Sequence, residues 1–461
     1  MGVTQLESLV RTVDRRVTDA EIERHGDAGS ISASPRLRVS LSAFSSHVVW
    51  TFATRLLMIF NSVVAGIIVA RWLGAKGVGE LAVINVAVAT LVQLGSFGLP
   101  SSNTYFIAQD QERFRAAAIN SLIFALLVGS ILALALSATS SLRPDWFGFV
   151  SPELVHIASI SIPFQLVTLI GLNILLAVGK VKEFNLLDLA GQLFVLVNAA
   201  AGLIVLKRGL GTLVTLNTAA AILVSVVVAM LLVVSARALV QSRWRADMSL
   251  LRRMITYGIK FHVSILAAAI ILRADLLIVN HFRGAEEAGV YSVASQFGLL
   301  LMLLPGVIAT LLFPRVTAEQ DARGETTCLV TRYTTFIMFL CCLAAVPFSL
   351  LLPVLYGAQF ADATKLLLIL LPGVYLMGLE SILVQHFNAL GLPRAIPIYW
   401  VVTLILNLVL VFALVPRFGA QGAAIASSIS YALIFALVAL HFHTSTGRSF
   451  TEVFVLGSLR G

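Results

Sequence analysis

The sequence predicts an all-α polytopic membrane protein with about twelve transmembrane helices, arranged as two six-helix halves. The first observation is composition: 59% of the residues are hydrophobic and only 12% are charged. Soluble globular chains average roughly 45–50% apolar and about 25% charged residues. These charges are too few to cover a soluble surface of this size, whereas lipid solvates apolar side chains directly. The other two observations are long apolar segments and an internal repeat.

Each apolar segment is long enough for a helix to cross the bilayer, which takes about 20 residues. β-Barrel strands are the alternative, but they need about ten residues with strict alternation, and these segments are longer and continuously apolar. Helices are therefore predicted over Phe44–Ala70, Leu81–Gly98, Ala116–Thr139, Leu154–Gly179, Leu186–Leu206, Gly209–Ala236, Tyr257–Asn280, Ala288–Pro314, Tyr333–Gly357, Leu366–Leu390, Ala395–Val415 and Phe418–Leu440.

Basic residues indicate how these helices are oriented. If the N-terminus is cytoplasmic and the sides alternate, 22 of the 32 lysines and arginines lie on the cytoplasmic side and 8 on the outer side. Cytoplasmic loops carry an excess of Lys and Arg. The bias predicts a multi-pass protein of the cytoplasmic (inner) cell membrane with both termini cytoplasmic. The net charge of +9 is explained by this bias, and no nucleic-acid partner is predicted.

The chain is predicted to contain two related halves at a shift of about 210 residues. IVARWLGAKGVGE follows the first helix and IVNHFRGAEEAGV follows the seventh, so Gly74 and Gly79 correspond to Gly284 and Gly289. Six helices per repeat give both halves the same orientation, and transporters commonly bind substrate between such repeats. The predicted domains are a polar extension (1–43), an N-lobe (44–236), a basic linker (237–256), a C-lobe (257–441) and a tail (442–461).

Several of these motifs resemble the polysaccharide flippases of the multidrug/oligosaccharidyl-lipid/polysaccharide exporter superfamily. They are GIIVARWLGAKGVGE, RGAEEAGVYSVASQ, LLFPRVTAE, LYGAQFADA and RFGAQGAAIASSIS, and the resemblance spans about residues 44–440. It implies two lobes around a central cavity and the transfer of undecaprenyl-pyrophosphate-linked glycans between leaflets by alternating access. The implied partners are membrane lipid, the lipid-linked glycan and other polysaccharide-assembly membrane proteins.

Charged residues deep in the membrane are costly, so they are candidates for function. Arg273 and Asp275 lie deep in the seventh helix, about 200° apart around its axis, so each needs a separate partner. His262, Arg273 and Asn280 are spaced to share one stripe of that helix. We predict that this stripe binds substrate, because a guanidinium fork fits phosphate oxygens. The alternative is an interhelical pair between Arg273 and a carboxylate.

Three further residues belong to the predicted site. Arg55 faces the cavity in one interpretation, which the resemblance favours, and reaches the inner headgroups in the other. Asp275 and Glu380 are candidates for coupling transport to H⁺ or Na⁺, although Asp275 would instead neutralise Arg273 if the two meet. Polar residues on the second and eighth helices, including Ser295 and Gln296, suit either sugar contacts or interhelical hydrogen bonds.

No catalytic site, metal site or other cofactor is predicted. The sequence lacks HExxH, Walker A and G-x-S-x-G motifs, and the predicted loops are short. Two rival functions remain open. A drug-type antiporter of the same fold would centre on cavity carboxylates, and a membrane glycan polymerase would need a long polar loop.

Overall fold

The structure is a computed structural model, and it describes residues 41–148, 150–239 and 245–455. The chain separates into two compact units, residues 1–49 and 50–461, and the description below concerns the second unit. The predicted extension (1–43) lies almost entirely outside the described residues. Within the described part, eleven helical segments are long and apolar enough to cross a membrane. One of them, Thr54–Gly95, contains two helices, which brings the number to the predicted twelve.

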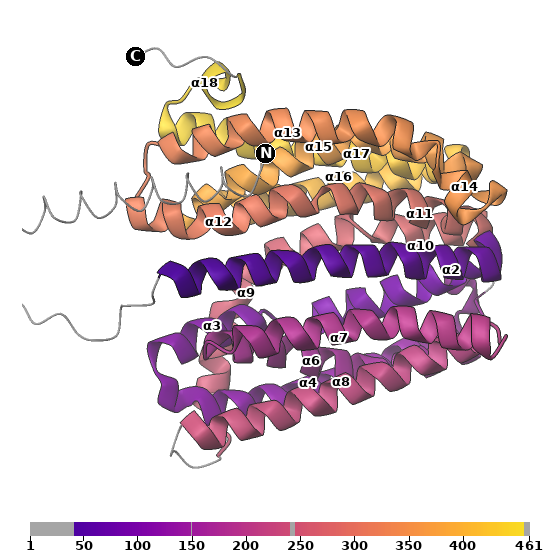
Figure 1. Cartoon of the computed structure of the whole chain (residues 1–461), viewed down its shortest axis with the longest axis horizontal. Coiled ribbons are helices and arrows are strands. Elements are labelled where there is room, and N and C mark those ends of the chain that lie inside the picture. Colours follow the sequence, from indigo (N-terminus) through magenta and orange to yellow (C-terminus); the bar gives the residue numbers. More distant parts are fainter. Residues whose placement is uncertain (1–40, 149, 240–244, 456–461) are drawn as a thin grey trace, which may run out of the picture. The chain divides into compact units, whose positions relative to one another are not determined.

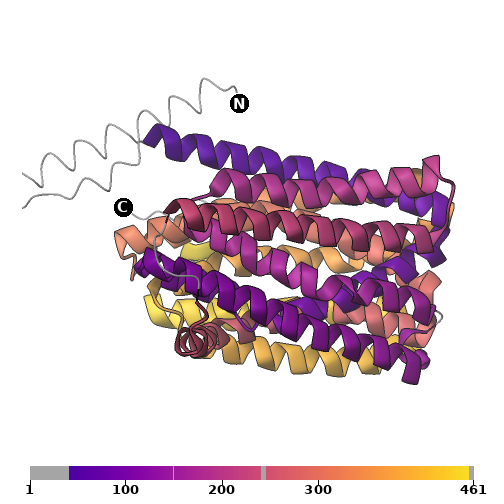
Figure 2. The same cartoon turned by 90° about the horizontal axis from the view of Figure 1, so that it is seen from below.

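Gly74 divides α2 (Leu41–Gly95) into two arms, because its backbone is not helical there (φ 68°, ψ −178°). Only glycine adopts such a conformation without steric cost. Figures 1 and 2 show most of the long helices running along one common direction. The remaining N-terminal elements are α3 (Leu99–Gln109), η1 (Gln111–Arg113), α4 (Phe114–Leu142), η2 (Pro144–Phe147), α5 (Pro152–Ser159), α6 (Ser161–Ala177), α7 (Val181–Ala199), η3 (Ala200–Val205) and α8 (Leu210–Leu239).

The C-terminal half repeats this pattern with its own interruptions. Its elements are α9 (Met248–Ile271), α10 (Ala274–Arg283), α11 (Ala285–Leu301), α12 (Leu303–Glu319), α13 (Glu325–Ser349), α14 (Leu352–Tyr356), η4 (Ala358–Phe360), α15 (Ala361–Leu390), α16 (Ala395–Phe418), α17 (Ala420–Thr446) and α18 (Phe450–Phe454). Pro163 and Pro305 each lie three residues after a helix junction, at Ile160 and Met302. Proline cannot donate the i→i−4 hydrogen bond, so each junction has a local cause.

The seventh predicted helix differs most from expectation. It begins at Met248 rather than Tyr257 and is interrupted at Leu272 and Arg273, between α9 and α10. The predicted linker (237–256) is correspondingly shorter, since α8 reaches Leu239; residues 240–244 lie outside the described part. Asp247 caps α9, and the N–H of Leu250 together with Ser249 holds the pKa of its carboxyl below the usual value. In Figure 1, α9 passes behind α2 at a steep angle to the other helices.

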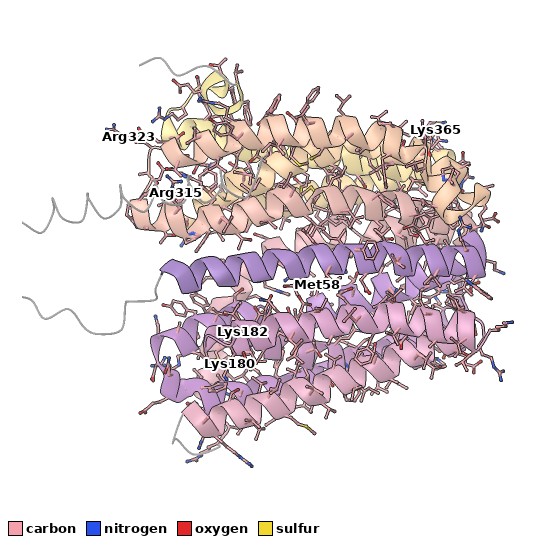
Figure 3. The ribbon with its side chains drawn as sticks, in the orientation of Figure 1. Met58, Lys180, Lys182, Arg315, Arg323 and Lys365 are labelled. Carbon is pink, nitrogen blue, oxygen red and sulfur yellow. The ribbon has the colours of Figure 1, made fainter. Side chains whose placement is uncertain are left out.

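The bundle has two ends, which we name by their contents. The crossing end holds Gly74 and Gly284, and the linker end holds the connection from α8 to α9. Figure 3 shows Lys180, Lys182, Arg315 and Arg323 toward one end and Lys365 toward the other. The sequence analysis assigned the first four of these residues to the cytoplasmic side and Lys365 to the outer side, which stays a prediction.

Glycines bring the two halves together at the crossing end. A Cβ atom on Gly79 would lie 1.7 Å from the carbonyl oxygen of Ala285, and one on Gly289 would lie 1.9 Å from that of Ala75. These contacts exchange under a shift of 210 residues, the predicted repeat offset. Gly284 also repeats the backbone conformation of Gly74, with φ 88° and ψ 172°. The backbones touch only because neither glycine carries a side chain.

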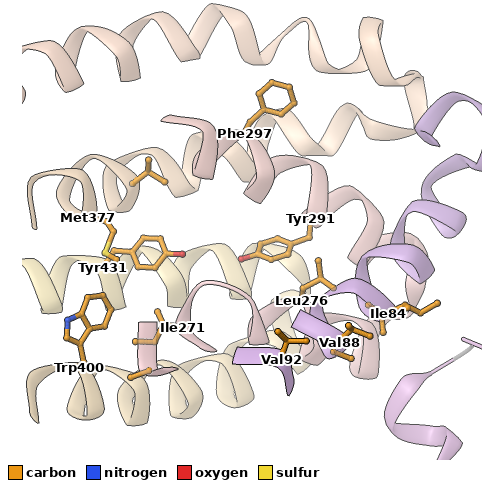
Figure 4. Close-up of a cluster of buried hydrophobic side chains, with 14 of the residues drawn as sticks. Ile84, Val88, Val92, Ile271, Leu276, Tyr291, Phe297, Met377, Trp400 and Tyr431 are labelled. Atoms are coloured by element: carbon orange, nitrogen blue, oxygen red, sulfur yellow. The ribbon is translucent and has the colours of Figure 1, made fainter. Parts of the chain in front are cut away.

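Buried polar pairs supplement apolar packing inside both halves. Asn103 bonds Ser121 at 3.0 Å, Asn198 bonds Asn217 at 3.0 Å, and Asn407 bonds Ser430 at 3.1 Å. Each such bond contributes on the order of 0.6 kcal/mol in a membrane. One hydrophobic cluster joins the halves, and Figure 4 shows part of it, with α2 side chains near Leu276 of α10.

Candidate functional site

Arg273 lies at the interruption of the seventh helix, at the N-terminal cap position of α10. Its backbone (φ −140°, ψ −27°) is outside the helical region, so the guanidinium starts from a break rather than from a continuous helix face. The side chain is exposed, and it has no hydrogen-bond or ion-pair partner among the described residues. Arg273 therefore does not pair with Asp275 or any other described carboxylate. Its charge is free to meet an anionic ligand.

Asp275, two residues further on, points into the C-terminal half. Its carboxylate accepts hydrogen bonds from the hydroxyls of Tyr291 on α11 and Ser427 on α17, the latter at 2.9 Å. The N–H of Leu276 donates to the other carboxylate oxygen at 2.8 Å. The side chain is buried, with 3% of its surface exposed. Three helices thus converge on one carboxylate.

A narrow pocket opens beside Asp275, between α11, α15 and α17. Its lining includes Asp275, Tyr291, Ser295 and Tyr431, together with apolar side chains from α11 and α15. Figure 4 shows the hydroxyls of Tyr291 and Tyr431 directed toward one another. The pocket therefore combines four oxygen-bearing side chains with apolar neighbours.

Glu380 is the second deep carboxylate, on α15. Only 1% of its surface is exposed, and its Oε1 atom has no hydrogen-bond partner among the described residues. A buried polar atom without a partner costs about 1–3 kcal/mol. Asp275 therefore has three hydrogen-bond donors around its carboxylate, whereas the Oε1 atom of Glu380 has none among the described residues.

Arg55 on the first arm of α2 forms an ion pair with Asp188 on α7, at 2.9 Å. The two side chains are 39% and 26% exposed, so the pair is half-buried. Asn61, nearly two turns further on, donates to the carbonyl of Gln192 on the same α7 at 2.5 Å. The first arm is therefore fastened to α7, and the Arg55 charge is already balanced within the N-terminal half.

The predicted stripe of His262, Arg273 and Asn280 is not a continuous surface. The interruption at residues 272–273 changes the helix phase between His262 and Asn280. His262 is buried with its ring stacked on Phe97, at 6.3 Å between centroids. Asn280 is buried and donates to the carbonyl of Phe147 at 3.0 Å. Both residues contact the N-terminal half, although neither ring nitrogen of His262 has a hydrogen-bond partner among the described residues. Substrate binding by these three residues stays a prediction.

Sequence reasoning missed the residues that surround the predicted charges. Asp275 is 16 residues from Tyr291 and 152 residues from Ser427 along the chain. Packing of α10, α11 and α17 brings the three side chains together. Gln296 on α11 donates to Ser62 on α2 at 3.0 Å and so links the two halves midway along the bundle. The polar residues of the eighth helix were a usable signal, but their partners were not predictable. No group of three metal-ligating side chains occurs among the described residues.

A family model described as "Polysaccharide biosynthesis protein" matches residues 68–365. A putative O-antigen transporter from Shigella flexneri is 27% identical over 184 residues, which is 39% of this chain and 44% of that protein. The probable low-salt glycan biosynthesis flippase Agl15 of Haloferax volcanii is 26% identical over 34% of this chain and 35% of that protein. The chain thus aligns with less than half the length of these relatives.

Two solved structures show the same fold. The lipid II flippase MurJ in an inward closed conformation has a TM-score of 0.72 at 14% identity, over 85% of this chain and 87% of that one. An inward-facing multidrug resistance MATE family transporter of the MOP superfamily has a TM-score of 0.66 at 18% identity, over 85% and 96% of the two chains. The helical fold of this chain is therefore similar to that of these two transporters.

Proposed function

Because the chain belongs to the polysaccharide biosynthesis protein family, we propose that it is a flippase for an undecaprenyl-pyrophosphate-linked oligosaccharide or polysaccharide intermediate. The glycan would cross the cytoplasmic membrane between the two halves by alternating access, while the acyl chain stays in lipid. The relatives named as an O-antigen transporter and a glycan flippase support this class of cargo. By the basic-residue bias, we assign the crossing end to the outside and the linker end to the cytoplasm.

The observation that supports an anionic cargo is the unpaired guanidinium of Arg273. Arg55 is balanced by Asp188, but no described carboxylate balances Arg273. An unbalanced charge within the membrane is expensive, so a bound pyrophosphate would remove a cost that the empty protein carries. The planar guanidinium would hold two phosphate oxygens at once. Arg55 would join only if the substrate displaced Asp188.

The energy source is proposed to be H⁺ or Na⁺ acting at Asp275 and Glu380. Glu380 suits a transient ligand because Oε1 has no partner in the described structure. Asp275 also suits a transient ion, because its carboxylate lines a pocket and lies beside the hydroxyls of Tyr291 and Ser427. The same two carboxylates favour the second candidate, a drug-type antiporter. Drug-resistance assays with Asp275→Asn and Glu380→Gln distinguish the flippase from the antiporter. An antiporter would confer resistance that these substitutions reduce, whereas a glycan flippase would confer none.

The test of the leading proposal is translocation in reconstituted vesicles. A labelled undecaprenyl-pyrophosphate glycan should become accessible to an outside probe when the purified protein is present. Hydrogen bonds to charged groups contribute about 1.5–3 kcal/mol, so Arg273→Ala should slow translocation by about 10- to 100-fold. Arg273→Lys should retain part of the rate.

Arg315→Ala is the matched control, because Arg315 is an exposed arginine already paired with Glu319 at 2.8 Å. Its translocation rate should stay near that of the parent. The proposal fails if the parent protein exposes no substrate, or if Arg273→Ala and Arg315→Ala behave alike.

A further inference from the structure

Two contacts join the halves at the crossing end, one from a side chain of the N-terminal half and one from a side chain of the C-terminal half. Arg71, at the end of the first arm of α2, donates from Nε to the carbonyl of Leu355 at 2.8 Å and from Nη2 to that of Val354 at 2.6 Å. His281, at the end of α10, contacts the carbonyl of Asp145 through Nδ1 at 3.1 Å. In each case the first helix of one half reaches the segment after the third helix of the other half.

The two contacts are related by the repeat. Residue 71 shifted by 210 is residue 281, and residue 145 shifted by 210 is residue 355. The Gly79 and Gly289 contacts exchange under the same shift. The crossing end is therefore an interface with local two-fold symmetry inside a single chain. In such an interface each contact occurs twice, so neither half can move away without breaking both copies.

A polar layer lies beneath this interface. Tyr356, next to the residues that accept from Arg71, is 1% exposed, and its hydroxyl lies 3.1 Å from a Cβ built on Gly66. One turn deeper, Gln296 bonds Ser62 across the two halves at 3.0 Å. Separation of the halves at the crossing end would expose this layer from that side.

We propose that Arg71 and His281 are the paired latches of a gate at the crossing end, and that Arg71 is the stronger latch. Arg71 makes two charge-assisted hydrogen bonds to two successive carbonyls, whereas His281 makes one contact. Charge-assisted bonds are roughly twice as strong as neutral ones. Arg71 thus sets how often the gate opens without touching the cargo. The inference goes beyond the proposed function and does not depend on which substrate is carried.

The test measures access to a cysteine placed behind the gate. Cys328, Cys341 and Cys342 are replaced by alanine, and Ser62→Cys is introduced as the reporter. A membrane-impermeant maleimide is added either to the crossing-end side or to the linker-end side. Arg71→Met keeps the length of the side chain but removes both hydrogen bonds. It should raise the labelling rate about tenfold from the crossing-end side only.

His281→Leu should raise the rate less than Arg71→Met, Arg71→Lys should restore part of the parent's slow rate, and the double variant should label fastest. Lys76→Met is the matched control, because Lys76 is 69% exposed and, within the described part of the chain, its ion pair is with Glu80, one turn away at 4.0 Å. The gate is refuted if Arg71→Met labels like Lys76→Met, or if labelling rises equally from both sides, which would mean general loosening.

If Arg71→Met cannot be purified as folded protein, the His281→Leu variant, which changes an exposed residue, tests whether the reciprocal contacts close the gate. An unchanged labelling rate in His281→Leu then overturns the reciprocal latch. Failure of the vesicle assay with labelled glycan would leave these outcomes unaffected, because no glycan takes part in thiol labelling.

Discussion

At the residue scale, the charged side chains of the helices differ in what surrounds them. Arg55 pairs with Asp188, and Asp275 accepts hydrogen bonds from two hydroxyls and an N–H. Among the described residues, the exposed Arg273 side chain has no partner, and neither does one carboxylate oxygen of the buried Glu380. Charge and depth alone do not distinguish these four. The arrangement concentrates the unbalanced charge at Arg273 and Glu380, which are therefore the residues whose replacement is most informative.

Glu380→Met should stabilise the protein while removing ion coupling. The substitution replaces a buried carboxyl, whose Oε1 atom has no hydrogen-bond partner among the described residues, with an apolar side chain of similar length. It should raise the free energy of unfolding by about 1–3 kcal/mol. Thermal unfolding in detergent, followed by intrinsic fluorescence, measures the change. Glu319→Gln is the control, because its exposed pair with Arg315 contributes about 1 kcal/mol at most. A lower melting temperature for Glu380→Met would show that an undescribed partner holds the carboxyl.

At the element scale, the helix interruptions determine where Arg273 and the glycine crossing lie. The breaks at Gly74, at residues 272–273, at Ile160 and at Met302 each follow from glycine, proline or a non-helical backbone. The break before α10 frees Arg273 from the helix face, and the break at Gly74 turns the second arm of α2 toward α11. Uninterrupted helices would have placed neither the guanidinium nor the glycine crossing where they are.

Gly79→Ala and Gly289→Ala should each destabilise the protein. A methyl group at either position would overlap a backbone carbonyl of the facing helix, at 1.7 Å and 1.9 Å respectively, so the helices must separate. Overpacking of this kind costs about 1–3 kcal/mol. Thermal unfolding checks the loss, and the two substitutions should have similar effects because their environments are related by the repeat.

Gly306→Ala provides the comparison for this pair. Gly306 lies within α12, and no neighbouring atom lies within 4 Å of a Cβ built there. Alanine at this position should therefore raise the free energy of unfolding by up to about 1 kcal/mol, because its helix propensity is higher than that of glycine. Equal losses at Gly79 and Gly306 would contradict the assignment of a close helix crossing to Gly79.

At the scale of the whole molecule, the two halves are joined at both ends but by different means. At the crossing end the contacts are reciprocal. At the linker end they are one-sided: α9 starts against the N-terminal half, where Ser102 donates to the Met254 carbonyl at 2.6 Å and Asn120 to that of Asp247 at 2.7 Å. The symmetry therefore describes one end of the bundle and not the other.

The proposed orientation can be checked with two exposed residues at opposite ends. Arg323→Cys should react with an impermeant maleimide only from the cytoplasmic side, and Lys365→Cys only from the outside, because the basic bias places them on opposite sides of the membrane (Figure 3). Intact cells and inside-out vesicles provide the two sides, in the cysteine-free background. Labelling of Arg323→Cys in intact cells would reverse the assignment of the termini.

The sequence by itself determined the fold class, the number of helices, the family and the offset of the repeat. These follow from composition, segment length and ordered motifs, which act locally along the chain and need no knowledge of packing. Only the tertiary structure decided that Asp275 meets Tyr291 and Ser427, that Arg55 meets Asp188, and that His262 and Asn280 are taken up by contacts with the other half. A partner on another helix depends on rotation about the helix axis and on where each helix breaks. A single backbone interruption at residues 272–273 was enough to separate three residues that an ideal helix would have aligned.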